Sequence, residues 1–371
     1  MIYLDYAASS PPFSQVIDEI GSVAMKHFGN PGALHQTGSA ARGILQKSRF
    51  ILARLTNVRP EEIYFTSGGT EANNWAVSAG CDVTGRKHIV CSAAEHSSVL
   101  EAVRRMQKKG YEVTYLNPEH DGRISPDAVE AVLRPDTALL CVQAVNNETG
   151  VIQDVDALAD LAHKRNVRYF CDGVQSFGHV VQNLYKADLI SLSAHKLGGP
   201  RGVGCLIVRQ PNLIDPMIVG GGQEFSLRSG TENLPGIAGF ALAAALSTQM
   251  IPQEQPRLAA LTALFESELR KEVPQVQIAG KGSPRSSILC CAFDGFSAEE
   301  MVVRLDLKGI CASPGAACAA RSAAPSHVLL SMGYSPKEAA QFVRFSPGRN
   351  TTAEEIHQTV AAICDIMKNR R

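Results

Sequence analysis

Seven short apolar runs, separated by segments with helical periodicity, constrain the fold of residues 62–208 more than any other feature. We expect one strand at each run, over residues 63–65, 88–91, 113–116, 138–145, 167–171, 189–192 and 204–208. Strands that alternate with helices favour a mostly parallel sheet with helices on both faces, so the expected fold class is α/β. In such sheets ligands bind beyond the carboxyl ends of the strands. Polar residues that follow these strands are therefore the first candidates for a site.

The rest of the chain predicts a second, smaller unit. A Gly-rich loop at 219–223 and an apolar helix at about 234–247 precede the segment IPQEQP at 251–256, which is typical of a linker. Beyond it we expect an α+β unit with strands at 287–293 and 341–345 and helices at about 256–272, 298–308 and 352–368. The predicted division is a large domain over 13–250 and a small domain formed by 1–12 and 251–371.

Composition and charge exclude several classes of partner. The chain has 36 Lys and Arg against 36 Asp and Glu, so no overall field attracts nucleic acid or an anionic membrane, and we expect neither as a direct partner. The first ten residues lack the basic and apolar regions of a secretory signal, which favours a cytoplasmic protein. The most membrane-like stretch, 236–246, is about half the length of a spanning helix and is expected to be buried.

The cysteines do not indicate a metal site or a disulfide framework. Ten of them are spread through the chain without a C-x-x-C pair, so we expect no metal and mostly small buried side chains.

A lysine and an aspartate follow two of the expected strands. Lys196 leaves strand 189–192 in a Gly-rich turn, where partial desolvation would make its amine a Schiff-base nucleophile. Asp172 ends strand 167–171 at the same edge of the sheet. Pyridoxal 5′-phosphate needs this pair, a lysine for its aldehyde and an aspartate for its pyridinium nitrogen. The plainer alternatives are a surface lysine and a helix N-cap.

The segment FTSGGTEAN at 65–73 combines a strand end, a glycine turn and a helix start, which together favour an anion such as the cofactor phosphate. Gly69 and Thr70 lie in this turn, and Ser193 and His195 could add donors; an ordinary capping signal is the alternative.

Two further strands end in candidate residues. His96 follows strand 88–91 and could stack on the cofactor ring and carry protons. Asn147 follows strand 138–145 and could bind cofactor or substrate, with a turn residue as the alternative.

The small unit contributes two candidates. Arg344 is the one cation in the apolar run FVRF and suits the carboxylate of an amino acid, unless it forms a structural ion pair. Cys318 lies in the small-residue stretch 313–325, which suits a thiol on a loop rather than in a core, although most cysteines are inert.

The ordered motifs carry a family resemblance. They are YLDYAA at 3–8, FGNP at 28–31, TSGGTE at 66–71, EH at 95–96, VNNETG at 145–150, DGVQS at 172–176, HK at 195–196, GGGQE at 220–224, RSGTEN at 228–233, Cys318, PSHVL at 325–329 and RFS at 344–346. In this order they resemble cysteine desulfurases of the NifS/IscS type, a class V aminotransferase group of fold-type I pyridoxal phosphate enzymes. The resemblance implies a large domain with a mostly parallel seven-stranded sheet covered by helices, plus a small α+β domain.

The resemblance also implies a role for each matching residue. Lys196 is similar to the Schiff-base lysine, Asp172 to the pyridinium partner, Gln175 to the residue near the ring hydroxyl and His96 to the residue on the ring face. The implied phosphate contacts are Thr70, Ser193 and His195, and Thr231 resembles a residue that the neighbouring subunit contributes in a homodimer with shared active sites. Asn147 and Arg344 resemble the substrate contacts, and Cys318 the nucleophile that forms a persulfide.

The implied activity is the conversion of L-cysteine to L-alanine, with the sulfur passed to a protein acceptor for iron–sulfur cluster, thio-cofactor or tRNA biosynthesis. The chain departs from the family at Pro314 and Ala316, close to the nucleophile. Two alternatives stay open: another class V reaction, such as transamination or selenocysteine cleavage, and a non-catalytic scaffold of the same fold.

Overall fold

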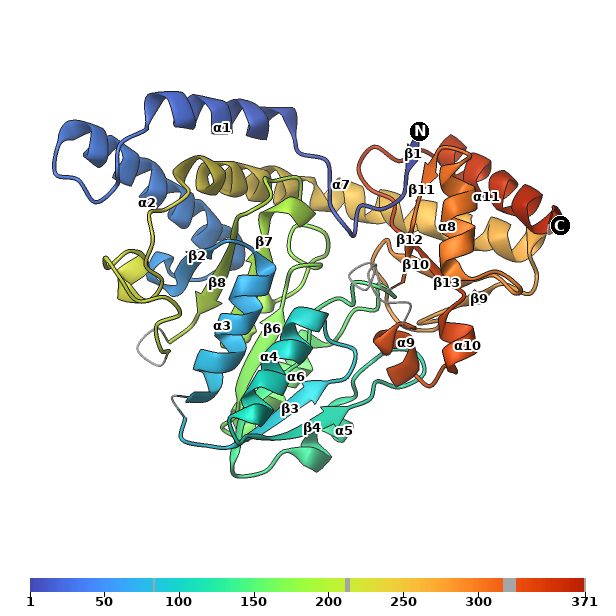
Figure 1. The fold of residues 1–371 in the computed structure, drawn as a ribbon, viewed down its shortest axis with the longest axis horizontal. Coiled ribbons are helices and arrows are strands. Elements are labelled where there is room, and N and C mark those ends of the chain that lie inside the picture. The colour runs from blue at the N-terminus through green and yellow to red at the C-terminus, as the bar shows by residue number, and fades with distance from the viewer. Residues whose placement is uncertain (83, 211–213, 316–324, 370–371) are drawn as a thin grey trace.

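The computed structural model describes residues 1–371 except positions 83, 211–213, 316–324 and 370–371 (Figure 1). Its central sheet has seven strands in the order β2-β8-β7-β6-β5-β3-β4. They are β2 (Ile63–Thr66), β3 (His88–Ser92), β4 (Glu112–Leu116), β5 (Thr137–Cys141), β6 (Arg168–Asp172), β7 (Leu189–Ser193) and β8 (Gly204–Val208). The strand β8 runs antiparallel to both of its neighbours, β2 and β7, and the other pairs in this sheet are parallel. All seven predicted strands and the mostly parallel sheet are confirmed, although β5 ends at Cys141 rather than at residue 145.

Helices cover both faces of this sheet and make three layers. One apolar core contains residues of α1 (Ser14–Lys26), α2 (Gln36–Thr56), α5 (Pro126–Val132), α6 (Val155–Lys164) and α7 (Leu234–Glu272). The core on the opposite face contains residues of α3 (Gly69–Asp82) and α4 (Ser97–Lys108). Within β7, Ile190 and Leu192 face the first core and Leu189 faces the second, as the alternation of a strand requires. Burial on both faces explains why these strands are almost continuously apolar.

The helix α7 corrects the predicted linker at 251–256. It runs without interruption from Leu234 to Glu272, with Pro252 and Pro256 inside it. A proline removes one helical hydrogen bond, but the two prolines are four residues apart, so the missing bonds fall on one side of the helix. Phe240 is buried in the core of the large sheet and Phe265 in the core of the small unit. Packing at both ends outweighs the local breaking signal, since tertiary contacts supply most of the stability of a helix in a protein.

By length and composition α7 could cross a membrane, but 61% of its most apolar window is buried inside the protein. The predicted burial of residues 236–246 agrees with this, because Phe240, Ala243 and Ala244 have no exposed surface.

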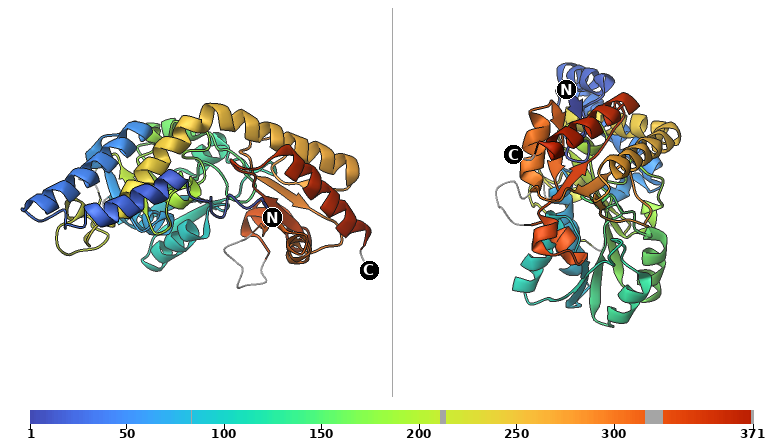
Figure 2. Two further views of the ribbon diagram at one scale, coloured as in Figure 1. Left: turned by 90° about the horizontal axis from the view of Figure 1, so that it is seen from above. Right: turned by 90° about the vertical axis from the view of Figure 1, so that its right-hand side faces the viewer.

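The small unit is built on a four-stranded antiparallel sheet in the order β12-β13-β10-β9. Its strands are β9 (Gln277–Ile278), β10 (Leu289–Ala292), β12 (Ser313–Pro314) and β13 (Phe342–Phe345), and its helices are α8 (Ala298–Asp306), α9 (His327–Ser331), α10 (Pro336–Ala339) and α11 (Ala353–Lys368). The chain begins in this unit, because β1 (Ile2–Tyr3) pairs in parallel with β11 (Ile310–Cys311). The second half of α7 and α11 lie beside each other in it (Figure 2). The two predicted strands and the helix starts at 298 and near 352 are confirmed.

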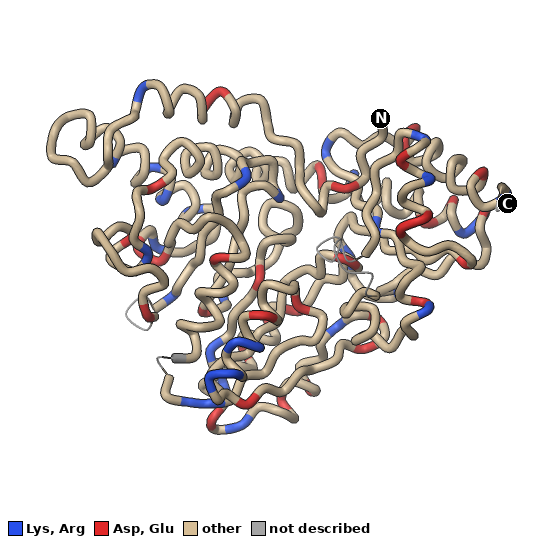
Figure 3. The backbone as a smooth tube through the Cα atoms, in the orientation of Figure 1, with Lys and Arg blue, Asp and Glu red and all other residues tan. Residues whose placement is uncertain are grey.

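Charged side chains do not segregate by sign. Acidic and basic residues both occur in each unit (Figure 3), in keeping with the net charge of zero. Among the described cysteines, seven are buried and none forms a disulfide: Cys81, Cys91, Cys141, Cys171, Cys205, Cys290 and Cys291.

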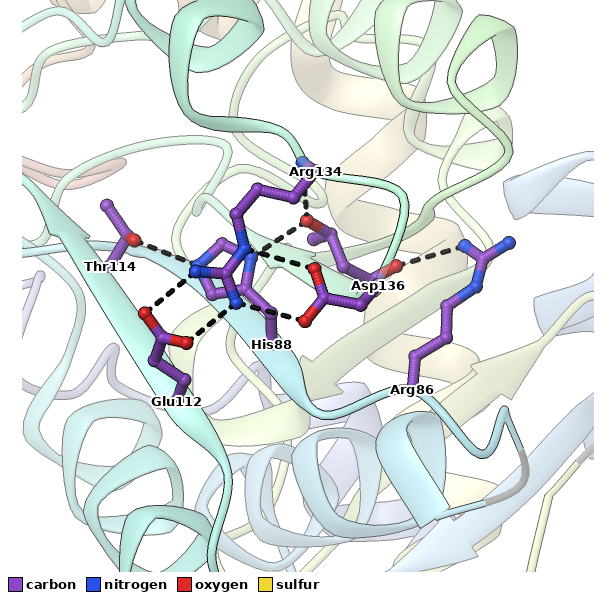
Figure 4. A network of polar contacts seen from close by, with 7 residues as sticks. Arg86, His88, Glu112, Thr114, Arg134 and Asp136 are labelled. Carbon is purple, nitrogen blue, oxygen red and sulfur yellow. Dashed lines mark hydrogen bonds and ion pairs between the residues drawn. The ribbon is translucent and has the colours of Figure 1, made fainter.

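A polar network ties together the amino ends of β3, β4 and β5 (Figure 4). The ring of His88 lies between the hydroxyls of Thr114 and Thr137, at 2.8 Å from each. Arg134 donates to both carboxylate oxygens of Glu112, at 2.7 and 2.8 Å. Every group here has a protein partner, and the network lies at the edge opposite the carboxyl ends. We therefore interpret this network as one that stabilises the sheet rather than as a ligand-binding site.

Candidate active site

A cavity of about 600 Å³ lies where the carboxyl ends of the central strands meet the small unit. Ten of the residues predicted for the site line it: Gly69, Thr70, His96, Asn147, Asp172, Gln175, Ser193, His195, Lys196 and Arg344. They come from segments as far apart as α3 and β13. The sheet therefore collects them in the place that the strand-end rule predicts.

Lys196 follows β7 directly, at the end of a short 3-10 turn over Ala194–Lys196. Its Nζ donates to the carbonyl oxygens of Ala7 and Ala8 at 2.6 and 3.1 Å. Its own carbonyl accepts from Ser10 Oγ at 2.6 Å and from His179 Nε2 at 3.0 Å. The amine is thus held at the cavity wall by two backbone carbonyls of the N-terminal segment.

Asp172 is the last residue of β6 and is only 6% exposed. Its Oδ2 accepts from Asn73 Nδ2 at 2.7 Å, and its Oδ1 accepts from the backbone N–H of Val174 at 2.9 Å. One donor on each oxygen fixes the orientation of the carboxylate. The alternative of a helix N-cap does not apply, because no helix begins directly after Asp172; the next helical element along the described chain starts at Leu184.

His96 is the N-cap of α4, and its Nδ1 accepts from the backbone N–H of Ser98 at 3.1 Å. Burial lowers the pKa of His96, with a further lowering from Lys196 that opposes the effect of Asp172. A positive charge is also unfavourable at a helix N-terminus. The ring is therefore neutral at physiological pH.

The phosphate end of the predicted site lies at the start of α3. Gly69 and Thr70 form its first turn, where free backbone N–H groups and the helix dipole favour an anion. A Cβ at Gly69 would lie 3.0 Å from Val174 Cγ2, so glycine permits the helix to approach this closely. Burial, followed by Lys196 and Arg201, lowers the pKa of His195 to about 4, so its ring is a neutral hydrogen-bonding group.

Arg344 lies on β13 and is 2% exposed. Its Nη2 donates to Asp5 Oδ1 at 2.8 Å, and its Nη1 donates to the carbonyl oxygen of Asn147 at 2.8 Å. Within the described residues its Nε has no partner, nor does the nearby Asn147 Oδ1. Arg344 therefore forms a structural ion pair with Asp5, which was the alternative to substrate binding. Its Nε–H is still available to donate to a ligand in the cavity.

Several residues on the cavity wall were not predicted from the sequence, among them Asn73, Ser98, Glu148 and His327. Asn73 lies one helical turn after Thr70, a spacing that places both on one side of α3. Glu148 accepts from Ser326 Oγ at 2.5 Å, and burial raises the pKa of Glu148 to about 7. His327 was part of a quoted motif, and its Nε2 donates to the carbonyl oxygen of Glu95 at 2.9 Å.

Two predicted residues remain, Thr231 and Cys318. Thr231 is exposed and does not line the cavity of its own chain. Cys318 lies outside the described residues. The described residues nearest to it in the chain are Gly315 and Pro325, and a Cβ at Gly315 would lie 3.1 Å from Glu148 Oε2 on the cavity wall.

The residues present fit pyridoxal 5′-phosphate. The cavity has a lysine amine, a buried carboxylate and a helix N-terminus with hydroxyls, which are the three groups that its aldehyde, ring nitrogen and phosphate need. Among the described residues, the wall also carries buried polar atoms without protein partners: Asn73 Oδ1, Asn147 Oδ1 and Arg344 Nε. Unsatisfied buried groups are rare in proteins and are expected where a polar ligand binds.

Comparisons with known proteins show which family the chain belongs to. The family Aminotransferase class-V matches residues 2–359. The chain is 36% identical over 375 residues to the cysteine desulfurase IscS of Dictyoglomus turgidum, and the match covers 100% of this chain and 95% of the relative. Among solved structures, it is similar to a NifS-like protein with a TM-score of 0.91 and 29% identity over 99% of both chains. It is also similar to SspA in complex with cysteine, with a TM-score of 0.82 and 31% identity over 93% of this chain and 98% of the other.

These matches confirm the resemblance and the fold class inferred from the ordered motifs. The chain belongs to the Aminotransferase class-V family, within its group of NifS/IscS-like cysteine desulfurases.

Proposed function

We propose that this protein is a pyridoxal 5′-phosphate-dependent cysteine desulfurase that converts L-cysteine to L-alanine and takes up the sulfur on Cys318 as a persulfide. The observation that carries the proposal is the meeting of Lys196, Asp172 and Arg344 in one cavity, although they lie on three separate segments. An amine, an acid and a guanidinium in this arrangement suit a cofactor and an amino acid together. The kinship with proteins named cysteine desulfurase supports L-cysteine as that amino acid.

Different residues would bind the aldehyde, the ring and the phosphate of the cofactor. Lys196 would bind its aldehyde and Asp172 its ring nitrogen, with Gln175 and His96 beside the ring. Its phosphate would take donors from Gly69, Thr70, Ser193 and His195. When bound, pyridoxal phosphate supplies an electron sink that stabilises negative charge at the substrate Cα.

The proposed substrate contacts use polar atoms that have no hydrogen-bond partner among the described protein residues. Arg344 would bind the cysteine carboxylate through its unpartnered Nε and its remaining N–H groups, and Asn147 Oδ1 would accept from the substrate. Lys196 Nζ would leave the carbonyls of Ala7 and Ala8 and then remove the Cα proton. Because these groups are held in fixed positions, a bound substrate would be oriented with its reacting bonds correctly placed.

The sulfur step is balanced by the enzyme thiol. Cys318, as a thiolate, would attack the substrate sulfur; the S–S bond forms as the C–S bond breaks, and the electron pair stays with the substrate carbon. Proton return to that carbon gives L-alanine, so L-cysteine and enzyme thiol become L-alanine and enzyme persulfide. His96, which lines the same cavity, would carry protons in this step.

The same proposal extends to assembly and location. A homodimer would let Thr231 of one chain complete the site of the other, which fits its exposure and its absence from the cavity of its own chain. The persulfide would pass to a protein acceptor for iron–sulfur cluster assembly, a thio-cofactor or tRNA, in the cytoplasm. Domains formed by residues 13–250 and by 1–12 with 251–371 are supported by the pairing of Ile2 with Ile310.

Product analysis tests the function. Purified protein loaded with pyridoxal phosphate is incubated with L-cysteine and dithiothreitol, and alanine and sulfide are measured. We expect equal amounts of both without any keto acid. A requirement for a keto-acid acceptor would instead identify an aminotransferase, cleavage restricted to selenocysteine would identify a selenocysteine lyase, and absence of any product would favour a scaffold.

A further inference from the structure

Two buried side chains connect His96 to Asp172 across the floor of the cavity. Asn73 Nδ2 lies 2.7 Å from Asp172 Oδ2 and 2.8 Å from Ser98 Oγ. Ser98 Oγ in turn lies 2.7 Å from His96 Nδ1. The result is a continuous bridge, Asp172–Asn73–Ser98–His96, that joins β6, α3 and α4.

The direction of each hydrogen bond in the bridge follows from its ends. The Asp172 carboxylate only accepts, so the Asn73 amide must present its nitrogen, and that nitrogen uses its second hydrogen on Ser98 Oγ. Ser98 Oγ therefore accepts from Asn73 and has its own hydrogen left for His96 Nδ1. The backbone N–H of Ser98 points to the same nitrogen, at 3.1 Å. Nδ1 must carry a lone pair, and the proton of the neutral ring sits on Nε2.

The need to give buried polar groups hydrogen-bond partners does not explain why an asparagine occupies position 73. Asn73 is 2% exposed, and its Oδ1 has no hydrogen-bond partner among the described residues. A buried amide with one unsatisfied atom destabilises a fold compared with an apolar side chain. A residue kept only for packing would avoid that cost, so the bridge itself is the feature to explain.

We propose that Asn73 and Ser98 are positioning residues that fix His96 as its Nε2–H tautomer and couple it to Asp172, so that the two groups expected to contact the cofactor ring form one unit. The inference rests on the proposed function, since it takes pyridoxal phosphate as the ligand. It adds two residues to the site and assigns His96 a hydrogen on Nε2. Nδ1 caps α4, so Nε2 is the only nitrogen of this ring that can exchange a proton with a substrate.

A double-mutant cycle on cofactor binding tests the coupling. Apoprotein of the wild type, Asn73→Ala, Ser98→Ala and the double variant is titrated with pyridoxal phosphate, and Kd is read from absorbance. Each single variant should weaken binding by roughly 5- to 50-fold, and the double variant should equal the weaker single variant within about twofold, because either change breaks the same bridge. Effects that multiply in the double variant would overturn the proposal.

Two further variants separate positioning from folding. Ser98→Thr keeps the hydroxyl and should restore most of the affinity that Ser98→Ala loses. Ser78→Ala removes a hydroxyl that donates to the Asn74 carbonyl within α3 and should leave Kd unchanged. Equal losses in Ser98→Thr and Ser98→Ala would contradict a role for the hydroxyl.

The tautomer is measured directly on the wild type, with no variant at risk of misfolding. Nitrogen-15 NMR of imidazole-labelled protein, with the His96→Gln spectrum used for assignment, should give a protonated Nε2 and an unprotonated Nδ1 at neutral pH. The reverse assignment, or a charged ring, would refute the bridge as drawn. Since this measurement needs no cofactor, it distinguishes failure of the bridge from failure of pyridoxal phosphate to bind at all.

Discussion

Arg344 Nη2 donates to Asp5 Oδ1 at 2.8 Å, so the arginine expected to bind the substrate carboxylate already holds a carboxylate of its own chain. Asp5 is brought there by the N-terminal segment, which forms a bridge between Asp5 and Ser346 beside β13. The pair keeps a guanidinium that is 2% exposed electrically balanced before substrate arrives. The unpartnered Nε then supplies part of the fork that a substrate carboxylate requires.

Replacement of Arg344 by lysine should selectively weaken ligands that carry a carboxylate. Arg344→Lys keeps the charge but loses the planar fork, so we expect KM for L-cysteine to rise by roughly 10- to 100-fold. Binding of L-alanine, followed by the absorbance of the bound cofactor, should weaken to a similar extent, whereas binding of cysteamine, which lacks a carboxylate, should change little. Arg304→Lys, at a half-buried position on α8 that does not line the cavity, is the matched control. Equal losses for L-alanine and cysteamine would contradict the assignment.

Cys318 should be required for sulfur release but not for cofactor binding. In Cys318→Ala we expect the cofactor spectrum of the wild type and at least a hundredfold loss of sulfide production, since removal of a catalytic nucleophile typically costs more than that. Cys364→Ala, which removes a partly exposed thiol on α11, should retain the wild-type rate. Sulfide release at the normal rate by Cys318→Ala would remove this residue from the reaction.

The large sheet was predictable because its strands are buried on both faces. Leu189 and Ile190 lie in different cores. A strand buried on both faces is a nearly continuous apolar run, which can be recognised from the local sequence. The two-residue strands β1 and β11 carry no such signal, since the pairing of Ile2 with Ile310 depends on a contact far along the chain. The continuity of α7 was mispredicted for a related reason: buried residues at both ends decide it, and the prolines are the only local cue.

The site divides in the same way. Residues such as Asp172 and Lys196 were predictable because they lie at or just after the ends of apolar strands, where the strand-end rule applies. Asn73 was not, because its importance lies in a hydrogen bond to Asp172, 99 positions away. Glu148 was quoted within a motif, but only burial reveals its raised pKa. The roles of Thr231 and Cys318 stay predictions that rest on the family resemblance.

Glu148 should make the protein less stable as the pH rises. Burial raises the pKa of Glu148 from its ordinary value of 4.5 to about 7. Between these values the folded state keeps a proton that the unfolded state has lost, so the free energy of unfolding falls as pH rises through this window, by a total on the order of 3 kcal/mol. The loss should be complete above pH 7, when the carboxyl is ionised in both states.

Denaturant unfolding at several pH values checks this. The free energy of unfolding of Glu148→Gln minus that of the wild type should grow between pH of about 4.5 and about 7. The exposed substitution Glu299→Gln should give a difference that does not vary with pH. A constant difference for Glu148→Gln as well would show that this carboxyl does not titrate in the window.

The continuous helix α7 predicts that one of its prolines is destabilising. Pro252 is exposed, so Pro252→Ala removes no core contact and allows residue 252 to donate to the carbonyl of Thr248. We expect the free energy of unfolding to rise by about 1–2 kcal/mol, since the recovered helical bond outweighs the greater entropy of the unfolded chain. Gln253→Ala, also exposed, should change it by less than about 0.5 kcal/mol. A loss of stability in Pro252→Ala would indicate that the chain breaks there.

The most direct test of the proposed function is whether pyridoxal phosphate bonds to Lys196. Protein loaded with pyridoxal phosphate is reduced with sodium borohydride, which fixes the cofactor to whichever amine has bound its aldehyde, and the digested protein is analysed by mass spectrometry. We predict one phosphopyridoxyl group per chain, on Lys196, and markedly weaker cofactor binding in Asp172→Ala. A modification on another lysine, or colourless protein without any adduct, would contradict the central claim that this cavity is a pyridoxal phosphate site.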